Sequence, residues 1–232
     1  MLNKLKEEVL KANIDLYKSG LVIHTWGNVS GIDRENNIMV IKPSGIDYDS
    51  MTADDMVVIE LDGTVAGGRL KPSSDTPTHL ELYNNFPDAG GVVHTHSTYA
   101  TAWAQAGLSI PAMGTTHADH FYGDVPCTRK LEQAEVENEY ELNTGKVIVE
   151  TFRSLDEKAI PGVIVNDHGP FVWGGSAAEA VYNAIALEEI ARMAFMTYSL
   201  AGNDRIDRYL LDKHYKRKHG SDAYYGQKKQ GE

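Results

Sequence analysis

Cysteine is almost absent from this chain of 232 residues, and Cys127 has no second thiol with which to form an intrachain disulfide. Such usage is typical of a reducing compartment. The N-terminus carries charge from Lys4 onward and has no apolar signal core. We therefore expect a cytoplasmic protein.

Basic residues are in the minority: 22 Lys and Arg stand against 33 Asp and Glu, which gives a formal net charge of −11. A nucleic-acid partner requires a basic face, so we expect none. The charge does not exclude a small anionic substrate, because the local field of a pocket can oppose the net charge.

Long hydrophobic runs and nucleotide-binding glycine motifs are also missing. Residues 89–118 form a stretch of 30 residues without Lys, Arg, Asp or Glu, but histidines, threonines, glycines and Pro111 interrupt it. We assign this stretch to the interior of a water-soluble fold and expect no membrane span. No GxGxxG follows an expected strand, so we expect no nicotinamide cofactor.

The remaining composition, 42% hydrophobic and 24% charged, is that of a globular protein whose length favours one large domain. Expected helices and strands are interleaved, and several connections have hairpin length. This favours a three-layer α/β/α domain with a mixed, largely antiparallel central sheet. We expect helices at 2–18, 76–86, from 97, at 177–200 and from 205, and strands near 28–32, 38–41, 56–60, 64–65, 90–96, 147–150, 163–165 and 171–173.

The most informative stretch is 90–96, an apolar run behind two glycines that ends in His-Thr-His. Side chains alternate along a strand, so His94 and His96 leave the same face about 7 Å apart. Two imidazoles at a strand end suit a divalent metal. The same spacing also occurs in satisfied core histidines, and by itself it leaves both interpretations open.

Two further ligand types stand in loops. His168 follows an apolar strand in a tight loop, and Asp75 directly precedes a helix, where it is equally suited to cap that helix. Three imidazoles and a carboxylate suit Zn²⁺, and Mn²⁺ or Co²⁺ remain open.

Two loops, Lys-Pro-Ser-Gly at 42–45 and Lys-Pro-Ser-Ser at 71–74, echo each other. Each places a hydroxyl and successive backbone N–H groups after a rigid proline, an arrangement that can bind an anion. Either loop alone is as readily an ordinary surface turn. The match between them favours a shared phosphate pocket.

Taken together, these motifs closely resemble the class II sugar-phosphate aldolase/epimerase family, and within it the epimerases. The match extends over about residues 1 to 227. The stretches that carry it are TWGNVS (25–30), KPSG (42–45), PSSDTPTH (72–79), HTH (94–96), GTTHAD (114–119) and YYGQ (224–227).

The resemblance implies one catalytic domain over 1–227, a disordered tail at 228–232, and metal-dependent interconversion of two ketopentose 5-phosphates that differ at C4. It implies a catalytic acid/base pair, Asp119 and Tyr225. It further implies a sugar-phosphate substrate contacted by Gly27, Asn28, Ser44, Gly45, Ser73 and Ser74, and one Zn²⁺ held by Asp75, His94, His96 and His168.

The resemblance also implies a homotetramer with active sites at the subunit interfaces, in which we expect Tyr225 to reach into a neighbouring pocket. In related aldolases the position of Asp75 resembles a glutamate that acts as a base. The shorter side chain here favours the epimerase over an aldolase that releases its aldehyde. The fold also occurs as a non-catalytic cytoskeletal domain, which need not keep four ligands.

Overall fold

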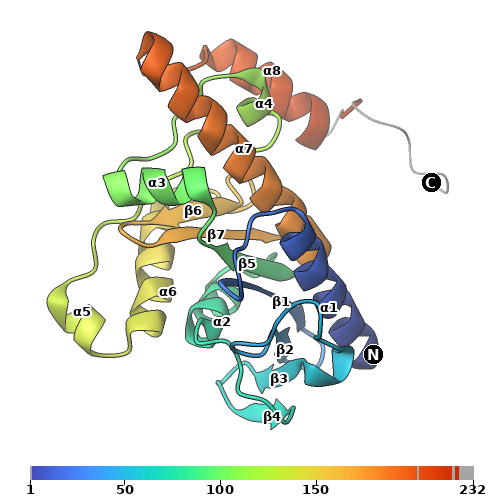
Figure 1. Ribbon diagram of the computed structural model, residues 1–232. Helices are drawn as coiled ribbons and strands as arrows, with labels where there is room; N and C mark the ends of the chain where they lie inside the picture. Colours follow the sequence, from blue (N-terminus) through green and yellow to red (C-terminus); the bar gives the residue numbers. More distant parts are fainter. Residues whose placement is uncertain (1, 203, 221–222, 225–232) are drawn as a thin grey trace.

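A seven-stranded antiparallel sheet runs through the centre of the molecule, in the order β4-β3-β2-β1-β5-β7-β6 (Figure 1). The computed structural model describes residues 2–202, 204–220 and 223–224, so Tyr225 and the tail at 228–232 lie outside the described residues. Every pairing between these strands is antiparallel, which confirms the expected, largely antiparallel character of the sheet; no parallel pair joins these seven strands. The strands are β1 (Gly27–Asp33), β2 (Ile38–Ile41), β3 (Val57–Glu60), β4 (Val65–Gly67), β5 (Gly91–Thr95), β6 (Gly162–Val165) and β7 (Gly169–Gly174).

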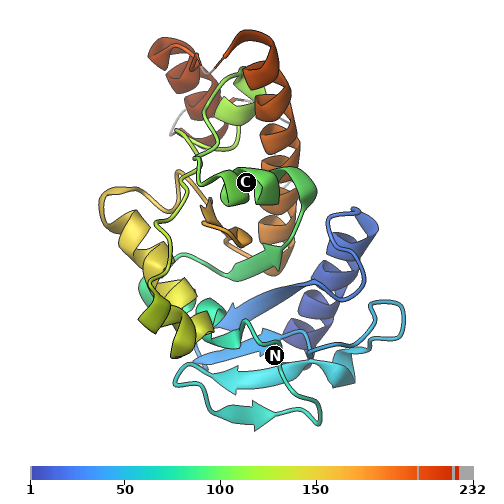
Figure 2. The same cartoon turned by 60° about the vertical axis from the view of Figure 1, so that its left-hand side comes forward.

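Helices cover both faces of the sheet, as the expected three-layer α/β/α arrangement requires (Figures 1 and 2). Helices α1 and α7 lie on one face, α2 and α6 on the other, and α4 and α8 lie together beside the C-terminal part of α7. The helices are α1 (Leu2–Lys18), α2 (Thr76–Asn85), α3 (Thr98–Ala106), α4 (Thr115–Ala118), α5 (Gln133–Glu137), α6 (Tyr140–Thr151), α7 (Ala177–Ala201) and α8 (Arg208–His219), with 3-10 turns at Ala53–Asp55 and Phe152–Ser154. Within the described residues, no helix is both long and apolar enough to cross a membrane.

Side-chain alternation on β1 and β5 decides which residues face the site. A Cβ on Gly91 would lie only 2.4 Å from the Ala177 Cα atom, so α7 packs directly against the backbone of β5. The next residue of β5, Val92, points to the opposite face. It pairs with Ser30 of β1, whose side chain hydrogen-bonds His79 of α2. Because His94 lies an even number of residues from Val92, it shares the face that is turned toward α2.

Ser176 and Glu179 have the spacing of a capping box at the start of α7, and the structure shows one half of that arrangement. Ser176 Oγ accepts the Glu179 N–H at 3.2 Å. The Glu179 carboxylate, however, accepts the N–H of Gly175 at 2.9 Å and not that of the capping residue. The first bond satisfies an N–H group of the first helical turn, and the second pairs the N–H of the residue before the cap.

The expected strand at 147–150 is wrong, because these residues belong to α6. The run Val-Ile-Val favoured a strand locally. In the structure Thr144, Gly145, Val147 and Ile148 are buried at helical spacing. A Cβ on Gly145 would lie 2.6 Å from the Glu81 side chain, so α6 and α2 are in close contact.

Candidate active site

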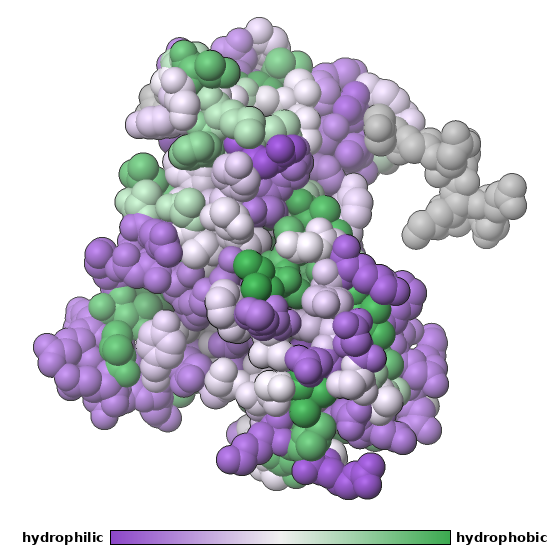
Figure 3. All heavy atoms as spheres, in the orientation of Figure 1, coloured by the Kyte–Doolittle hydropathy of each residue, from purple (hydrophilic) through white to green (hydrophobic). Residues whose placement is uncertain are grey.

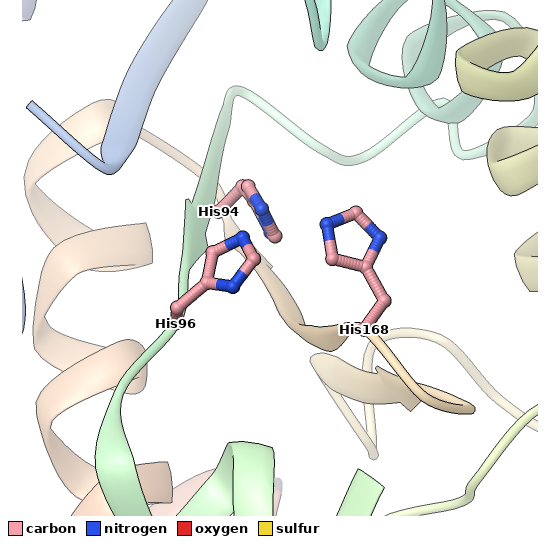
Figure 4. Close-up of side chains that lie close together, drawn as sticks. All are labelled: His94, His96 and His168. Atoms are coloured by element: carbon pink, nitrogen blue, oxygen red, sulfur yellow. The ribbon is translucent and has the colours of Figure 1, made fainter. Parts of the chain in front are cut away.

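Three histidine rings converge at the carboxyl end of β5 (Figure 4). Ring centroids are 4.9 Å apart for His94 and His96, 4.7 Å for His94 and His168, and 5.0 Å for His96 and His168. One ligand nitrogen from each ring lies within 4.8 Å of the other two. His94 is buried, His168 half-buried and His96 exposed, so the cluster is open to solvent on one side.

Neighbouring groups hold two of these rings in the orientation that a metal requires. His94 Nδ1 lies 3.0 Å from the carbonyl oxygen of Pro170. A carbonyl only accepts, so Nδ1 carries the proton and Nε2 is left as the ligand atom. Tyr140 Oη lies 3.2 Å from His168 Nδ1. A phenol oxygen accepts a hydrogen bond from Nδ1–H in the tautomer whose Nε2 is free to bind an ion.

The surroundings of His168 and His96 lower the pKa of both rings and so favour the neutral imidazole, the form that binds metal. Burial, followed by the neighbouring His94 and His96, lowers the pKa of His168 to about 3. Burial and then His94 also lower the pKa of His96. One nitrogen from each of the three imidazole rings, directed into one small space, forms a donor set that fits a divalent transition metal.

Asp75 stands beside this cluster on the wall of the same cavity. Its carboxylate does not cap α2, although the residue occupies the capping position; instead Asn28 Nδ2 donates to Asp75 Oδ2 at 2.7 Å. Burial raises the pKa of Asp75, but four neighbouring influences together outweigh burial and hold the pKa below its usual value: His94, His79, the Asn28 hydrogen bond and His168. A carboxylate that is already ionised suits a cation. Asp75 is nevertheless not a member of the close group of three ligand atoms.

All four expected metal ligands and all six expected substrate contacts line one cavity of about 590 Å³. The register of the sheet explains part of this, because Asn28 on β1 pairs with His94 on β5. The remaining walls come from the two Lys-Pro-Ser loops and from the start of α6. Sequence reasoning assigned no site role to six further lining residues: Thr25, Trp26, Lys42, Pro43, Tyr140 and Glu141.

The two Lys-Pro-Ser loops lie side by side, as their similarity suggested. Pro43 and Pro72 form an antiparallel bridge. The N–H of Ser44 donates to the Lys71 carbonyl at 2.9 Å, and that of Ser73 donates to the Lys42 carbonyl at 3.0 Å. These two N–H groups are therefore used in pairing the loops, which leaves the serine hydroxyls as the groups able to face an anion.

Lys42 also lines the cavity. It is the first residue of the KPSG motif at 42–45, but sequence reasoning assigned it no role. It is only 1% exposed. Its Nζ donates to the carbonyls of Pro43 at 3.2 Å and Ile46 at 2.9 Å, and lies 4.7 Å from the centre of the Tyr48 ring. Burial lowers the pKa of Lys42 to about 8, and Asp47 opposes this shift in part. The sequence signal was the lysine in the motif itself; nothing local indicated that its amine turns inward.

Comparisons with known proteins show the family to which the chain belongs. The family model of the class II aldolase and adducin N-terminal domain matches residues 7–195. The chain belongs to this family. It is 59% identical over 228 residues to proteins named L-ribulose-5-phosphate 4-epimerase UlaF from Salmonella paratyphi A and Salmonella typhi, and the match covers 98% of this chain and 100% of each relative. Its fold is similar to that of an L-fuculose 1-phosphate aldolase, with a TM-score of 0.79, 25% identity, and coverage of 92% of this chain and 95% of that one.

Asp119, one of the two expected acid/base residues of this family member, does not lie in the histidine cavity. It follows α4 and lines a second cavity of about 330 Å³ together with His120, Tyr182 and Lys218. Within one chain, therefore, the structure brings together the metal and substrate residues but places Asp119 in a separate cavity. Tyr225 lies outside the described residues.

Helix α8 surrounds the Asp119 carboxylate with nitrogen-bearing side chains, two of which are an arginine and a lysine. Arg217 Nη2 lies 2.8 Å, His214 Nδ1 3.0 Å and Lys218 Nζ 3.6 Å from its oxygens. Burial raises the pKa of Asp119, but these neighbours, Arg217 first, outweigh it and hold the pKa below its usual value. Asp119 and α8 therefore form one unit, and the N–H of Tyr224 donates to the Arg217 carbonyl at the end of that unit.

Proposed function

We propose that the protein is a metal-dependent epimerase that interconverts L-ribulose 5-phosphate and D-xylulose 5-phosphate. The observation that carries this proposal is the single cavity in which three histidines and a carboxylate lie beside two paired Lys-Pro-Ser loops. The 59% identity to proteins with this named activity supports the choice of reaction within the family.

The chemistry of the substrate explains why such a cavity is needed. In a 2-ketopentose 5-phosphate the C4 hydrogen is β to the carbonyl and is not acidic, so simple deprotonation does not invert C4. Removal of the C4 hydroxyl proton instead allows the C3–C4 bond to break, which gives an enediolate and glycolaldehyde phosphate. Rotation of the aldehyde followed by re-formation of the bond inverts C4.

We assign the metal to one Zn²⁺ per chain, held by Asp75, His94, His96 and His168. A bound divalent cation would supply Lewis-acid stabilisation of the negative charge that develops on the substrate oxygens. The protein residues set the geometry: Pro170 and Tyr140 fix two of the imidazole rings, and Asn28 holds the carboxylate.

The part of the cavity wall formed by the two Lys-Pro-Ser loops is suited to the phosphate group. Serine hydroxyls donate hydrogen bonds to phosphate oxygens, and the buried Lys42 ammonium supplies a positive charge in a chain whose net charge is −11. The main chain at the two glycines permits close approach of the substrate. The proposed contacts are Gly27, Asn28, Lys42, Ser44, Gly45, Ser73 and Ser74.

Asp119 and Tyr225 are proposed as the acid/base pair that acts on the C4 oxygen from opposite sides. Since Asp119 lies in a different cavity from the histidines of its own chain, we propose that it acts in the cavity of a neighbouring subunit. Exposed apolar side chains near the end of α7 provide a surface for such association (Figure 3): Phe195, Met196 and Leu200 are 51%, 45% and 87% exposed. We propose a cytoplasmic homotetramer with one catalytic domain, 1–227, in each chain.

Metal analysis together with an assay on L-ribulose 5-phosphate tests the proposal. We expect one divalent ion per chain and formation of D-xylulose 5-phosphate. The His96→Asn variant is expected to lose metal and activity while it keeps its fold. Accumulation of free aldehyde would instead identify an aldolase, and a metal-free, inert protein would identify a non-catalytic domain.

Solvent isotope labelling tests the route. When C3–C4 breaks, the C4 hydrogen stays on carbon, so turnover in D₂O should leave C4 unlabelled in the mass spectrum of the product. Deuterium at C4 would rule out cleavage of this bond.

A further inference from the structure

Tyr48 belongs to the connection between β2 and β3 that begins with the Lys-Pro-Ser-Gly loop. Its side chain is buried, and it does not line the substrate cavity. Lys42 Nζ, which does border that cavity, lies over the Tyr48 ring at 4.7 Å from its centre. A cation in this position is attracted by the negative face of the ring, and the attraction is stronger where water is excluded. Tyr48 therefore acts on a cavity residue from outside the cavity.

Two further contacts fix the orientation of the Tyr48 ring. Its hydroxyl donates to the carbonyl oxygen of Gly27 at 2.7 Å. The ring of Tyr17 on α1 stacks parallel to it, with centroids 5.0 Å apart and an interplanar angle of 2°. Burial raises the pKa of Tyr48, so the phenol keeps its proton and remains a donor. The ring cannot turn away from Lys42 without disturbing these two contacts.

The ring supplies what the two carbonyls around Lys42 do not. A lysine amine at the end of four methylene groups samples many positions unless its neighbours restrict it. Among the described residues, the carbonyls of Pro43 and Ile46 accept two of the three N–H groups of the ammonium, so one remains for a substrate oxygen. A ring face attracts the charge as a whole and requires no particular N–H group. It therefore restricts the amine while the third N–H group stays available.

We propose that Tyr48 is a positioning residue of the phosphate site, whose ring holds the Lys42 ammonium at the cavity wall. This inference rests on the proposed function, because it requires Lys42 to bind the substrate phosphate. The bond to Gly27 gives the ring a fixed place relative to the rest of the cavity, since Gly27 lines the cavity and pairs with Thr95, the residue between His94 and His96. Tyr48 thus helps to set the distance between the phosphate end and the histidine end of the site.

Tyr48 is also part of the hydrophobic core, so its loss would destabilise the protein whatever it does for Lys42. Two variants separate the ring face from the hydroxyl: Tyr48→Phe keeps the face and loses the donor to Gly27, whereas Tyr48→Leu loses both. Phe152→Leu is the matched control for lost packing, because it removes a buried ring that lies outside the substrate cavity. The melting temperature should fall in all three variants.

Steady-state kinetics and inhibition by inorganic phosphate measure the effect on the phosphate site. Tyr48→Leu should raise KM for L-ribulose 5-phosphate about 3–30-fold, the range of cation–ring contacts at increasing desolvation, with a much smaller change in kcat. The inhibition constant of inorganic phosphate should rise in parallel. Tyr48→Phe and Phe152→Leu should keep KM close to that of wild type. An unchanged KM in Tyr48→Leu, or an equal increase in either of the other two variants, would overturn the proposal.

A fluorinated series covers the case in which Tyr48→Leu does not fold. Phenylalanines with one, two or three ring fluorine atoms at position 48 keep nearly the same shape, but each fluorine withdraws negative charge from the ring face. KM should rise stepwise from Tyr48→Phe to the trifluorinated ring, because only the attraction for the cation changes. A series with constant KM would overturn the proposal and leave Tyr48 a packing role.

A double-mutant cycle with Lys42→Met checks the path. If Tyr48 acts through Lys42, adding Tyr48→Leu to Lys42→Met should raise KM little further, and full additivity would contradict the proposal. Lys42→Met with the KM of wild type would instead refute the phosphate role of Lys42 in the proposed function. A raised KM in Lys42→Met beside an unchanged KM in Tyr48→Leu would refute the positioning role alone.

Discussion

At the scale of single residues, Lys42 combines burial with charge. Its ammonium is enclosed by two carbonyls and a tyrosine face, yet it borders the substrate cavity. Such an amine is partly desolvated before substrate arrives, so its attraction for a phosphate is stronger than that of a surface lysine. This suits a group that identifies the phosphate end of the substrate.

Lys42→Met should therefore raise KM for the sugar phosphate about 10–100-fold, with a much smaller change in kcat, because the interaction contributes to binding and not to bond cleavage. Lys71→Met is the matched control: Lys71 occupies the same place in the second loop but is exposed and lies outside the cavity. Steady-state kinetics measure KM and kcat for both variants, and only Lys42→Met should show the increase in KM. Equal KM values for Lys42→Met and wild type would remove Lys42 from the phosphate site.

Lys42 also predicts a pH dependence. Its pKa is lowered to about 8, so the amine is charged below that pH and loses its charge above it. In wild type, kcat/KM should therefore fall about tenfold per pH unit above pH 8. A pH series of kcat/KM shows whether this alkaline limb disappears in Lys42→Met, as we expect; its persistence would assign the limb to another group.

The contact between Tyr140 and His168 leads to a prediction about Zn²⁺ affinity. The Tyr140 hydroxyl is the partner of His168 Nδ1, so Tyr140→Phe should weaken Zn²⁺ binding about tenfold without loss of the fold. Tyr17→Phe removes a hydroxyl that lies outside the cavity, and its Zn²⁺ affinity should equal that of wild type. Chelator competition measures the Zn²⁺ dissociation constants of the two variants. Equal constants would contradict the role of Tyr140 in holding His168.

At the scale of helices and strands, local patterns predicted what depends on local geometry. Alternation along β5 predicted that His94 and His96 share a face, and the ring positions confirm it. The helix at 147–150 was missed because its short β-branched run is common to buried strands and buried helices. Only the contact of Gly145 with α2 distinguishes them, and that contact requires the folded chain.

The same limit applies to the site. The Lys42 amine is held by a loop carbonyl, and the Tyr140 hydroxyl contacts His168, which is distant in sequence. No local sequence pattern encodes either contact. His79 lay within a motif, yet its buried hydrogen bond to Ser30 spans 49 positions of sequence. The motifs thus predicted residues that line one cavity, whereas the groups that hydrogen-bond those residues became visible only in the structure.

The contact between β5 and α7 supports a prediction about stability. A methyl group on Gly91 would lie 2.4 Å from both the Cα and the N atom of Ala177, and these backbone atoms cannot move without shifting α7. Gly91→Ala should therefore lower the free energy of unfolding by about 3 kcal/mol or more. Gly114→Ala is the control, because a Cβ there meets nothing within 4 Å and the backbone is extended. Denaturant melts of the metal-free variants measure both, and equal stabilities would contradict close packing at Gly91.

At the scale of the whole molecule, the two halves of the proposed machinery lie apart within one chain. The histidines line one cavity and Asp119 another. Asp119 is bound to α8 by Arg217 and His214, and Tyr225 follows that helix closely in sequence. Sequence reasoning expected only Tyr225 to enter a neighbouring pocket; the structure supports the same assignment for Asp119. Both acid/base groups would then come from one subunit and the metal from the next.

Mixed oligomers test this arrangement, because a ring of subunits allows one chain to complete the site of another. Homo-oligomers of His96→Asn and of Asp119→Asn should each be nearly inactive. After subunit exchange, an interface that joins the histidines of an Asp119→Asn chain to the Asp119 of a His96→Asn chain is intact. Random mixing in equal amounts makes about one interface in four of this kind, so activity should recover to about a quarter of wild type.

The pair of Asp119→Asn and Tyr225→Phe is the matched control. If one subunit supplies both Asp119 and Tyr225, every subunit in that mixture lacks one of the two groups, and mixing restores no activity. Native mass spectrometry establishes that exchange has taken place in both mixtures. Recovery only in the Asp119→Asn and Tyr225→Phe mixture would place these two residues on different subunits, and no recovery in the His96→Asn mixture would return Asp119 to the cavity of its own chain.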